Sequence, residues 1–420
     1  MALERVWKRA TWVDRIRDRP FGKIVDGFCQ WLLDRGYARA TIRAYTQAVR
    51  HLDNYIAQRG DAAPEPLSSD LIEAFLKDRL PKRSLHRLGG KARDSTGRSI
   101  RCLSKYLRAT GLLHVTSPSP PYQGILDEYL IWMRDYCHCA ERTTELRSRY
   151  LIPFLKHLGS AGIAPAKLAR LSPYTLEHFI LDYARNAGDS TPAHVATAMR
   201  TFCHFCWNRR YISRDLAFAV PSFRRYRLSS IPNGITDEQA HKALREIDRR
   251  TVTGRRDYAI ILLLYTYGVR GEQVSGLRLG DIRWAASQIQ FAALKHGKAV
   301  LQPLTDEVGT GLLAYLQDGR PPSPHQEVFL TVCAPYSPLA RRSLSRIARE
   351  RLQNVGIHIS RSGARVFRHG LATRMLAAGY RLKEIADMLG HRSIQTTAIY
   401  AKVDFRALEQ VTLEWPEGEE

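Results

Sequence analysis

Apolar residues recur every three or four positions along most of the chain, which is the spacing of one face of an α-helix. In the first half Tyr45, Val49 and Leu52 follow this spacing, and Leu151 and Phe154 repeat it roughly 100 residues later. The strings LSSD and LSP, which begin at Leu67 and Leu171, supply helix N-caps at matching places. The pattern predicts two helical bundles, the second a diverged tandem copy of the first.

Proline-rich stretches divide the chain. TSPSPPYQG at 116–124 separates the two copies, and VPSFRRYRLSSIPNG at 220–234 separates the second copy from the remainder. We therefore expect an N-terminal helical domain, a second helical domain, a third domain and a short C-terminal tail helix, over residues 1–118, 121–225, 235–403 and 404–420.

The third part mixes helices with a small sheet. Thr236 and Gln239 have capping-box spacing at the start of an amphipathic helix. Further on, Ile289 and Phe291 alternate with other positions in SQIQFAALKHGKAVLQPL, which predicts a hairpin that turns near His296 with Lys295 beside its tip. The expected fold class is mainly α: helical N-terminal bundles followed by a mostly helical domain with a small β-sheet.

Charge indicates the partner. Lys and Arg number 64 against 41 Asp and Glu, which gives a formal charge of +23 and a pI near 10.0. Such a field attracts polyanions, and double-stranded DNA is the partner we expect. A surface that only keeps the protein soluble is the alternative, but solubility does not need so large an excess of one sign.

Other classes fit poorly. The longest apolar run, YAIILLLY at 258–265, is far shorter than the about 20 residues of a membrane span. The N-terminus has no apolar signal segment, so we expect a cytoplasmic, nucleoid-associated protein, in a bacterium, with reduced thiols. The clusters CHC at 137–139 and CHFC at 203–206 allow a zinc site, yet buried free thiols on a core-facing helix are the favoured interpretation, and no metal is predicted.

Four segments stand in a fixed order in the third part. They are YGVRGEQVSGLRLGDI with Arg270, ALKHGKAVLQPL with Lys295, RVFRHGLATRML with Arg368, and LGHRSIQTTAIY with His391 and Tyr400. Together they resemble the tyrosine recombinases of the phage integrase family, and the resemblance covers nearly all of 235–403. It implies a core-binding, SAM-like helical domain over 121–225 and a catalytic domain over 235–403 that clamp duplex DNA.

The chemistry of these residue types agrees with the resemblance. A tyrosine hydroxyl that attacks phosphorus gives a phosphotyrosyl ester, which preserves the energy of the broken strand, and Tyr400 is the expected nucleophile. Arg270 and Arg368 offer paired donors to the phosphate oxygens, His391 adds another donor, and Lys295 is placed to protonate the leaving oxygen. This scheme needs no cofactor. Structural ion pairs for the arginines, and a core role for Tyr400, are the alternatives.

Two positions depart from the family pattern. Arg365 stands where the family usually has histidine, and an arginine binds phosphate but cannot accept a proton. The neighbouring His369 is expected to point elsewhere on its helix. Two routes therefore remain for the activation of Tyr400: its pKa is lowered electrostatically, or His391 accepts its proton. Gln273 also replaces a commonly acidic residue, with Glu272 beside it.

Basic residues cluster at 81–101, 223–227 and 340–351, where loops and linkers would contact phosphates. The residues predicted to bind DNA are Arg83, Arg87, Lys91, Arg93, Arg98, Arg224, Arg225, Arg227, Arg341 and Arg342.

The function that we expect is a site-specific DNA recombinase or integrase of a mobile element. It would act through a 3′-phosphotyrosyl intermediate and a Holliday junction, as a tetramer on DNA, alone or with sister recombinases. A nicking-closing topoisomerase of type IB and a catalytically silent DNA-binding relative are the alternatives. The tail would pack on a neighbouring subunit or on its own domain.

Overall fold

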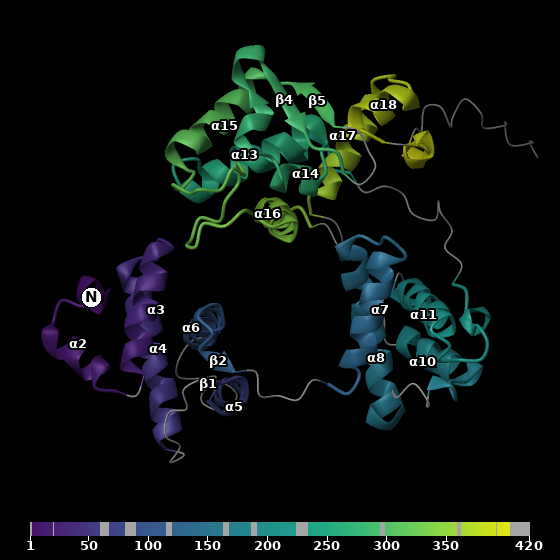
Figure 1. Cartoon of the computed structure of the whole chain (residues 1–420). Helices are drawn as coiled ribbons and strands as arrows, with labels where there is room; N and C mark the ends of the chain where they lie inside the picture. Colours follow the sequence, from purple (N-terminus) through teal and green to yellow (C-terminus); the bar gives the residue numbers. More distant parts are fainter. Residues whose placement is uncertain are drawn as a thin grey trace, which may run out of the picture. The chain divides into compact units, whose positions relative to one another are not determined.

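The computed structural model is mostly helical, as the sequence predicts (Figure 1). It describes residues 2–19, 21–58, 67–79, 90–114, 120–162, 168–185, 191–223, 234–294, 299–358, 363–391 and 393–403. Residues 115–227 form one compact unit, and residues 1–114 with 228–420 form the other. The first part, the middle part and the last part of the chain each have a hydrophobic core of their own.

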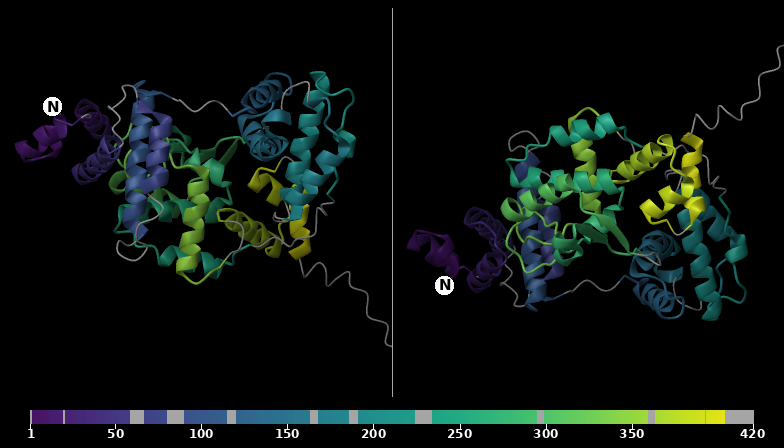
Figure 2. Two further views of the ribbon diagram at one scale, coloured as in Figure 1. Left: turned by 90° about the horizontal axis from the view of Figure 1, so that it is seen from below. Right: turned by 90° about the horizontal axis from the view of Figure 1, so that it is seen from above.

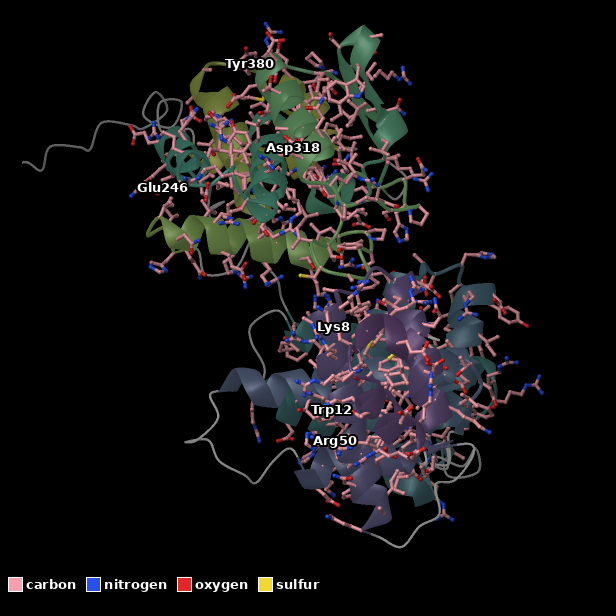
Figure 3. The ribbon with its side chains drawn as sticks, turned by 90° about the vertical axis from the view of Figure 1, so that its left-hand side faces the viewer. Lys8, Trp12, Arg50, Glu246, Asp318 and Tyr380 are labelled. Atoms are coloured by element: carbon pink, nitrogen blue, oxygen red, sulfur yellow. The ribbon has the colours of Figure 1, made fainter. Side chains whose placement is uncertain are left out.

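The first core is built by a run of helices. They are α1 (Ala2–Val6), α2 (Ala10–Arg17), α3 (Gly22–Asp34), α4 (Arg39–Ala57), α5 (Ser69–Arg79) and α6 (Gly90–Ala109). The short strands β1 (Leu67–Ser68) and β2 (Leu113–His114) pair in parallel. The ring of Trp12, which is labelled in Figure 3, stacks on Trp7 with centroids 5.7 Å apart.

The middle part repeats this order of helices. Its elements are α7 (Gln123–Asp135), α8 (Glu141–Gly162), α10 (Pro173–Arg185), α11 (Thr191–Asn208) and the 3₁₀ turn η1 (Ala217–Ala219). The series α7, α8, α10 and α11 follows the order of α3, α4, α5 and α6, and the duplication stays a prediction. Cys203 and Cys206 are fully buried beside Phe202, and burial raises the pKa of the Cys203 thiol to about 12. Cys203 and Cys206 are core residues, as predicted, whereas Cys137 is exposed and Cys139 is half-buried.

The last core surrounds α13 (Val252–Tyr267), which is buried along most of its length and packs against α15 (Asp306–Asp318) and α17 (Arg365–Ala377) (Figures 1 and 2). The other helices are α12 (Asp237–Arg245), α14 (Gly271–Ser275), α16 (Arg341–Asn354) and α18 (Leu382–Leu389). The short 3₁₀ turns are η2 (Leu279–Asp281), η3 (Trp284–Ala286), η4 (Ile394–Thr396) and η5 (Ala398–Val403).

The predicted hairpin is confirmed and gains a strand. Strands β4 (Gln288–Phe291) and β5 (Val300–Pro303) pair antiparallel with Phe291 opposite Val300, and β3 (Ile282–Arg283) pairs with the other edge of β4. The capping box at α12 is also present, because the Gln239 amide donates to the Thr236 hydroxyl at 3.2 Å and the Thr236 amide donates to Gln239 Oε1 at 3.1 Å.

Polar contacts fix the helices around α13. Asp257 is 3% exposed and accepts hydrogen bonds from Arg256 at 2.7 Å and from Arg351 of α16 at 2.9 Å. Arg255 donates to the backbone oxygen of Asp318, at the end of α15, at 3.0 Å; Figure 3 labels Asp318. Within the described ranges, no helix combines the length and apolar composition needed to cross a bilayer.

Candidate active site

Arg270 is placed by the end of α13. Gly268 closes that helix in the left-handed conformation, with φ 57°, and a Cβ there would lie 2.7 Å from Leu371 Cδ2. The chain then turns through buried Val269, so that Arg270 comes directly before α14. A glycine is required at this point by its φ and by the close approach of α17, and the half-buried position of Arg270 follows from the turn.

Gln273 supports the same turn. Its Oε1 accepts a hydrogen bond from the Arg270 amide at 3.1 Å, and its Nε2 donates to the Ala292 backbone oxygen at 3.2 Å. The amide side chain both donates and accepts, which an ionised carboxylate cannot do. The departure from the family pattern at this position therefore links Arg270 to the end of β4.

Arg368 is the buried arginine of the cluster. It lies on α17, is 6% exposed, and donates to the backbone oxygens of Gly268 at 3.0 Å and Leu389 at 2.7 Å. Burial, with a further contribution from Arg270, lowers its pKa to about 9, so the guanidinium remains charged at neutral pH. Both bonds go to backbone oxygens, and within the described ranges no carboxylate forms an ion pair with Arg368, as one would in an ordinary structural ion pair.

His391 follows α18. Gly390 ends that helix with φ 62°, and His391 Nδ1 lies 2.7 Å from the Thr397 hydroxyl. Burial, with Arg368 and Arg270 adding to it, lowers the His391 pKa to about 3. The ring is therefore neutral at physiological pH, and its Nδ1 is paired with Thr397 and not with Tyr400.

Tyr400 lies in η5, next to α17. It is 1% exposed and belongs to a small core with Leu371, Ile385 and Leu389. Burial raises its pKa, although Arg368, Arg365 and Arg270 all act to lower it. Electrostatic lowering of the Tyr400 pKa, one of the two routes of activation that the sequence leaves open, is outweighed in the protein without DNA, because removal of the hydroxyl from water has the larger effect.

His369 does not point away from the site. Its Nδ1 lies 2.8 Å from the Tyr400 hydroxyl, and the two ring centroids are 5.5 Å apart. The contact was not predicted because it depends on η5, a later segment that packs against the face of α17 that carries His369. The signal in the sequence was a histidine that follows Arg368, within one turn of Arg365.

All of the predicted catalytic residues that the structure describes thus come together from three separated segments. Arg270, Arg365, Arg368 and Tyr400 act on one another electrostatically, and Arg365 is exposed at the start of α17. Lys295 lies outside the described residues, between β4 and β5. Among the described residues, no group of three or more His, Cys, Asp or Glu side chains is arranged to hold a metal ion.

Few of the expected DNA contacts can be placed. Arg341 and Arg342 begin α16, and Arg341 lies 3.7 Å from Glu272, two residues beyond Arg270. Arg98 lies on α6, as do Lys91 and Arg93, whose side chains are outside the described part. Arg83, Arg87, Arg224, Arg225 and Arg227 lie outside the described residues altogether.

Comparison with known proteins identifies the class. The sequence profile of the Phage integrase family matches residues 234–407. A Sinorhizobium fredii protein classed as integrase/recombinase y4rA is 33% identical over 411 residues, which is 96% of this chain and 97% of that protein. The chain therefore belongs to the tyrosine recombinases of the phage integrase family. Tyrosine recombinase XerD of Mycobacterium leprae is 28% identical over 310 residues, 69% of this chain and 94% of its own.

Solved structures agree on the fold. XerH site-specific recombinase, in a post-cleavage complex with a palindromic difH substrate, matches 82% of this chain and 95% of its own with a TM-score of 0.56 and 16% identity. A lambda integrase dimer bound to a core site matches 70% of this chain and 98% of its own with a TM-score of 0.51 and 14% identity. The helical architecture with its small sheet is that of this family.

Proposed function

We propose that this protein is a site-specific DNA recombinase that cuts and rejoins DNA through a 3′-phosphotyrosyl intermediate at Tyr400. The observation that carries the proposal is the surroundings of the Tyr400 hydroxyl. The charges of Arg270, Arg365 and Arg368 all favour its ionised form. Arg368 has no carboxylate partner among the described residues. Such a cluster of arginines can bind a phosphodiester, whose negative charge would balance the positive charge of the guanidinium groups.

The arginines would bind the scissile phosphate. Two of the five N–H donors of Arg368 are used by backbone oxygens, and the others remain for phosphate oxygens. With the Thr397 hydroxyl at Nδ1, neutral His391 would donate from Nε2. Each preorganised donor to the extra charge of the transition state is worth about 3 kcal/mol. Lys295, between β4 and β5, would protonate the leaving 5′-oxygen.

Tyr400 must become accessible before it reacts. With 1% of its surface exposed, Tyr400 is covered by protein, and a phosphodiester reaches its hydroxyl only when the covering side chains move aside. We infer that DNA binding moves these side chains and lets the phosphate enter among the arginines, while Tyr400 keeps its contact with His369.

Double-stranded DNA is the proposed partner. The charge of +23 and the DNA complexes of XerH and lambda integrase support it. In this proposal residues 121–225 form the core-binding domain and 235–403 the catalytic domain, and the exposed arginines of α16 contact phosphates. Strand exchange through a Holliday junction requires four active sites on DNA, so we expect a tetramer, in the setting of a mobile element.

An exchange assay tests the proposal. Two differently labelled duplexes, made from the DNA on either side of the gene, are incubated with the wild type and with Tyr400→Phe. Recombinant duplexes that depend on Tyr400 would support the proposal. Relaxation of supercoiled DNA without exchange would favour a type IB topoisomerase, and binding without any cleavage would favour a silent DNA-binding protein.

A further inference from the structure

The Tyr400 hydroxyl must lose a proton when it attacks phosphorus, and most of its charged neighbours cannot take one. Arg270, Arg365 and Arg368 are donors only. His391 has its Nδ1 on Thr397. Among the described residues, the one side chain with a potential lone pair within hydrogen-bond distance of the Tyr400 hydroxyl is His369, through Nδ1 at 2.8 Å.

The fold holds this pair in place. The Thr373 hydroxyl donates to the His369 backbone oxygen at 3.0 Å, one turn along α17. A Cβ on Gly234 would lie 2.9 Å from the His369 carbonyl carbon, so the chain before α12 packs directly on this turn. The Tyr400 ring is held by the small core that it forms with Leu371, Ile385 and Leu389. His369 is therefore a positioned contact of the reacting atom.

We propose that His369 is the general base that accepts the proton of Tyr400 during strand cleavage, the task that the family histidine replaced by Arg365 is expected to perform. In this step the Tyr400 oxygen forms a bond to phosphorus as the bond from phosphorus to the 5′-oxygen breaks. The Tyr400 proton moves to His369 Nδ1, which gives an imidazolium, and the leaving oxygen takes a proton from Lys295. This inference rests on the proposed function.

The base is weak until DNA arrives. His369 faces Arg365 and Arg368 on its own helix, Tyr400 on η5 and His391 beyond α18. Burial first, then the two arginines, lower the His369 pKa to about 4, so the ring is neutral and one of its two nitrogens carries a lone pair. A phosphate bound by those arginines would offset their charge and raise the proton affinity of His369 where cleavage occurs. Proton transfer is thereby coupled to binding of the substrate.

A cleavage assay separates this role from a structural one. The substrates are nicked duplexes from the DNA beside the gene, with either an oxygen or a sulfur as the 5′-bridging atom. His369→Asn keeps a hydrogen-bonding atom near the position of Nδ1 but does not take up a proton. His241→Asn is the matched control, since the exposed His241 contacts only the Asp237 backbone oxygen of its own helix and the ring of Tyr265 among the described residues, and touches none of the proposed catalytic residues.

We expect His369→Asn to slow covalent cleavage by roughly 10²–10⁴-fold, the usual contribution of a general base. The defect should persist with the sulfur substrate, whose leaving group needs no acid, and should shrink as rising pH ionises Tyr400 directly. A rate equal to that of His241→Asn, or a loss that is constant with pH, would overturn the inference. If wild type forms no adduct that depends on Tyr400, the proposed function fails instead.

The protonation state of His369 can also be measured in the protein without DNA. Nitrogen NMR of the ¹⁵N-histidine-labelled full chain should show the His369 Nδ1 unprotonated at neutral pH, with a resonance that moves in Tyr400→Phe. A proton on Nδ1 in the wild type would overturn the inference whatever the DNA assays show, because the lone pair would then be absent.

Discussion

Arg368 Nη1 donates a hydrogen bond at 3.0 Å to the backbone oxygen of Gly268, the residue that ends α13 two positions before Arg270. The second arginine of the site thus holds the turn that presents the first one. One guanidinium therefore makes structural contacts with the backbone and belongs to the cluster of arginines that we propose binds phosphate.

Arg368→Lys tests this double role. Lysine keeps the charge but has no planar fork, so it cannot reach Gly268 and Leu389 and also pair with phosphate. We expect cleavage to fall by roughly 10²–10³-fold with the protein still folded. Circular dichroism and the covalent cleavage assay check this, and full activity of Arg368→Lys would contradict it.

Gly268→Ala should damage both stability and activity. Its φ of 57° costs a non-glycine residue about 1–2 kcal/mol. The clash at 2.7 Å with Leu371 Cδ2 adds to this and displaces the turn before Arg270. The control is Gly379→Ala, since Gly379 has φ 86° with nothing within 4 Å of its Cβ position. The midpoint temperature of thermal unfolding should be lower in both variants than in the wild type, with the larger decrease in Gly268→Ala. Only Gly268→Ala should also lose cleavage activity.

Asp257→Asn should unfold at a much lower denaturant concentration. Removing the buried anion leaves Arg256 uncompensated and detaches Arg351 of α16. Breaking a buried pair in this way costs roughly 3–5 kcal/mol. Asp248→Asn removes an exposed pair with Arg250 and should change little. Equal midpoints for the two variants in urea would show that the Asp257 network contributes nothing.

Asp53→Asn should stabilise the protein near neutral pH. Asp53 is 6% exposed, and its Oδ1 has no hydrogen-bond partner among the described residues. Burial raises its pKa to about 6, so the folded protein keeps a proton that the unfolded chain releases above 3.8. Stability is therefore lost as pH rises through this window. At about pH 7 the Asp53→Asn variant should unfold at a higher urea concentration than the wild type. This difference between the two midpoints should disappear below about pH 4.

The sequence was sufficient for the fold class, the hairpin, the capping box at α12 and the family, because these depend on local spacing and on ordered motifs. It failed at His369, since the contact with Tyr400 depends on how η5 packs on α17, and neighbouring positions on a helix do not reveal which face meets a later segment. Nor could it show that burial raises the Tyr400 pKa, because burial of that ring is a tertiary property.

The measurement that tests the central claim most directly is covalent trapping of DNA on Tyr400. Wild type and Tyr400→Phe are incubated with nicked duplexes from the DNA beside the gene, separated under denaturing conditions, and the linked peptide is identified by mass spectrometry. We predict a 3′-phosphotyrosyl adduct on the peptide that contains Tyr400, absent from Tyr400→Phe. An adduct on another residue, or one that persists in Tyr400→Phe, would contradict the assignment of the nucleophile and of the site built around it.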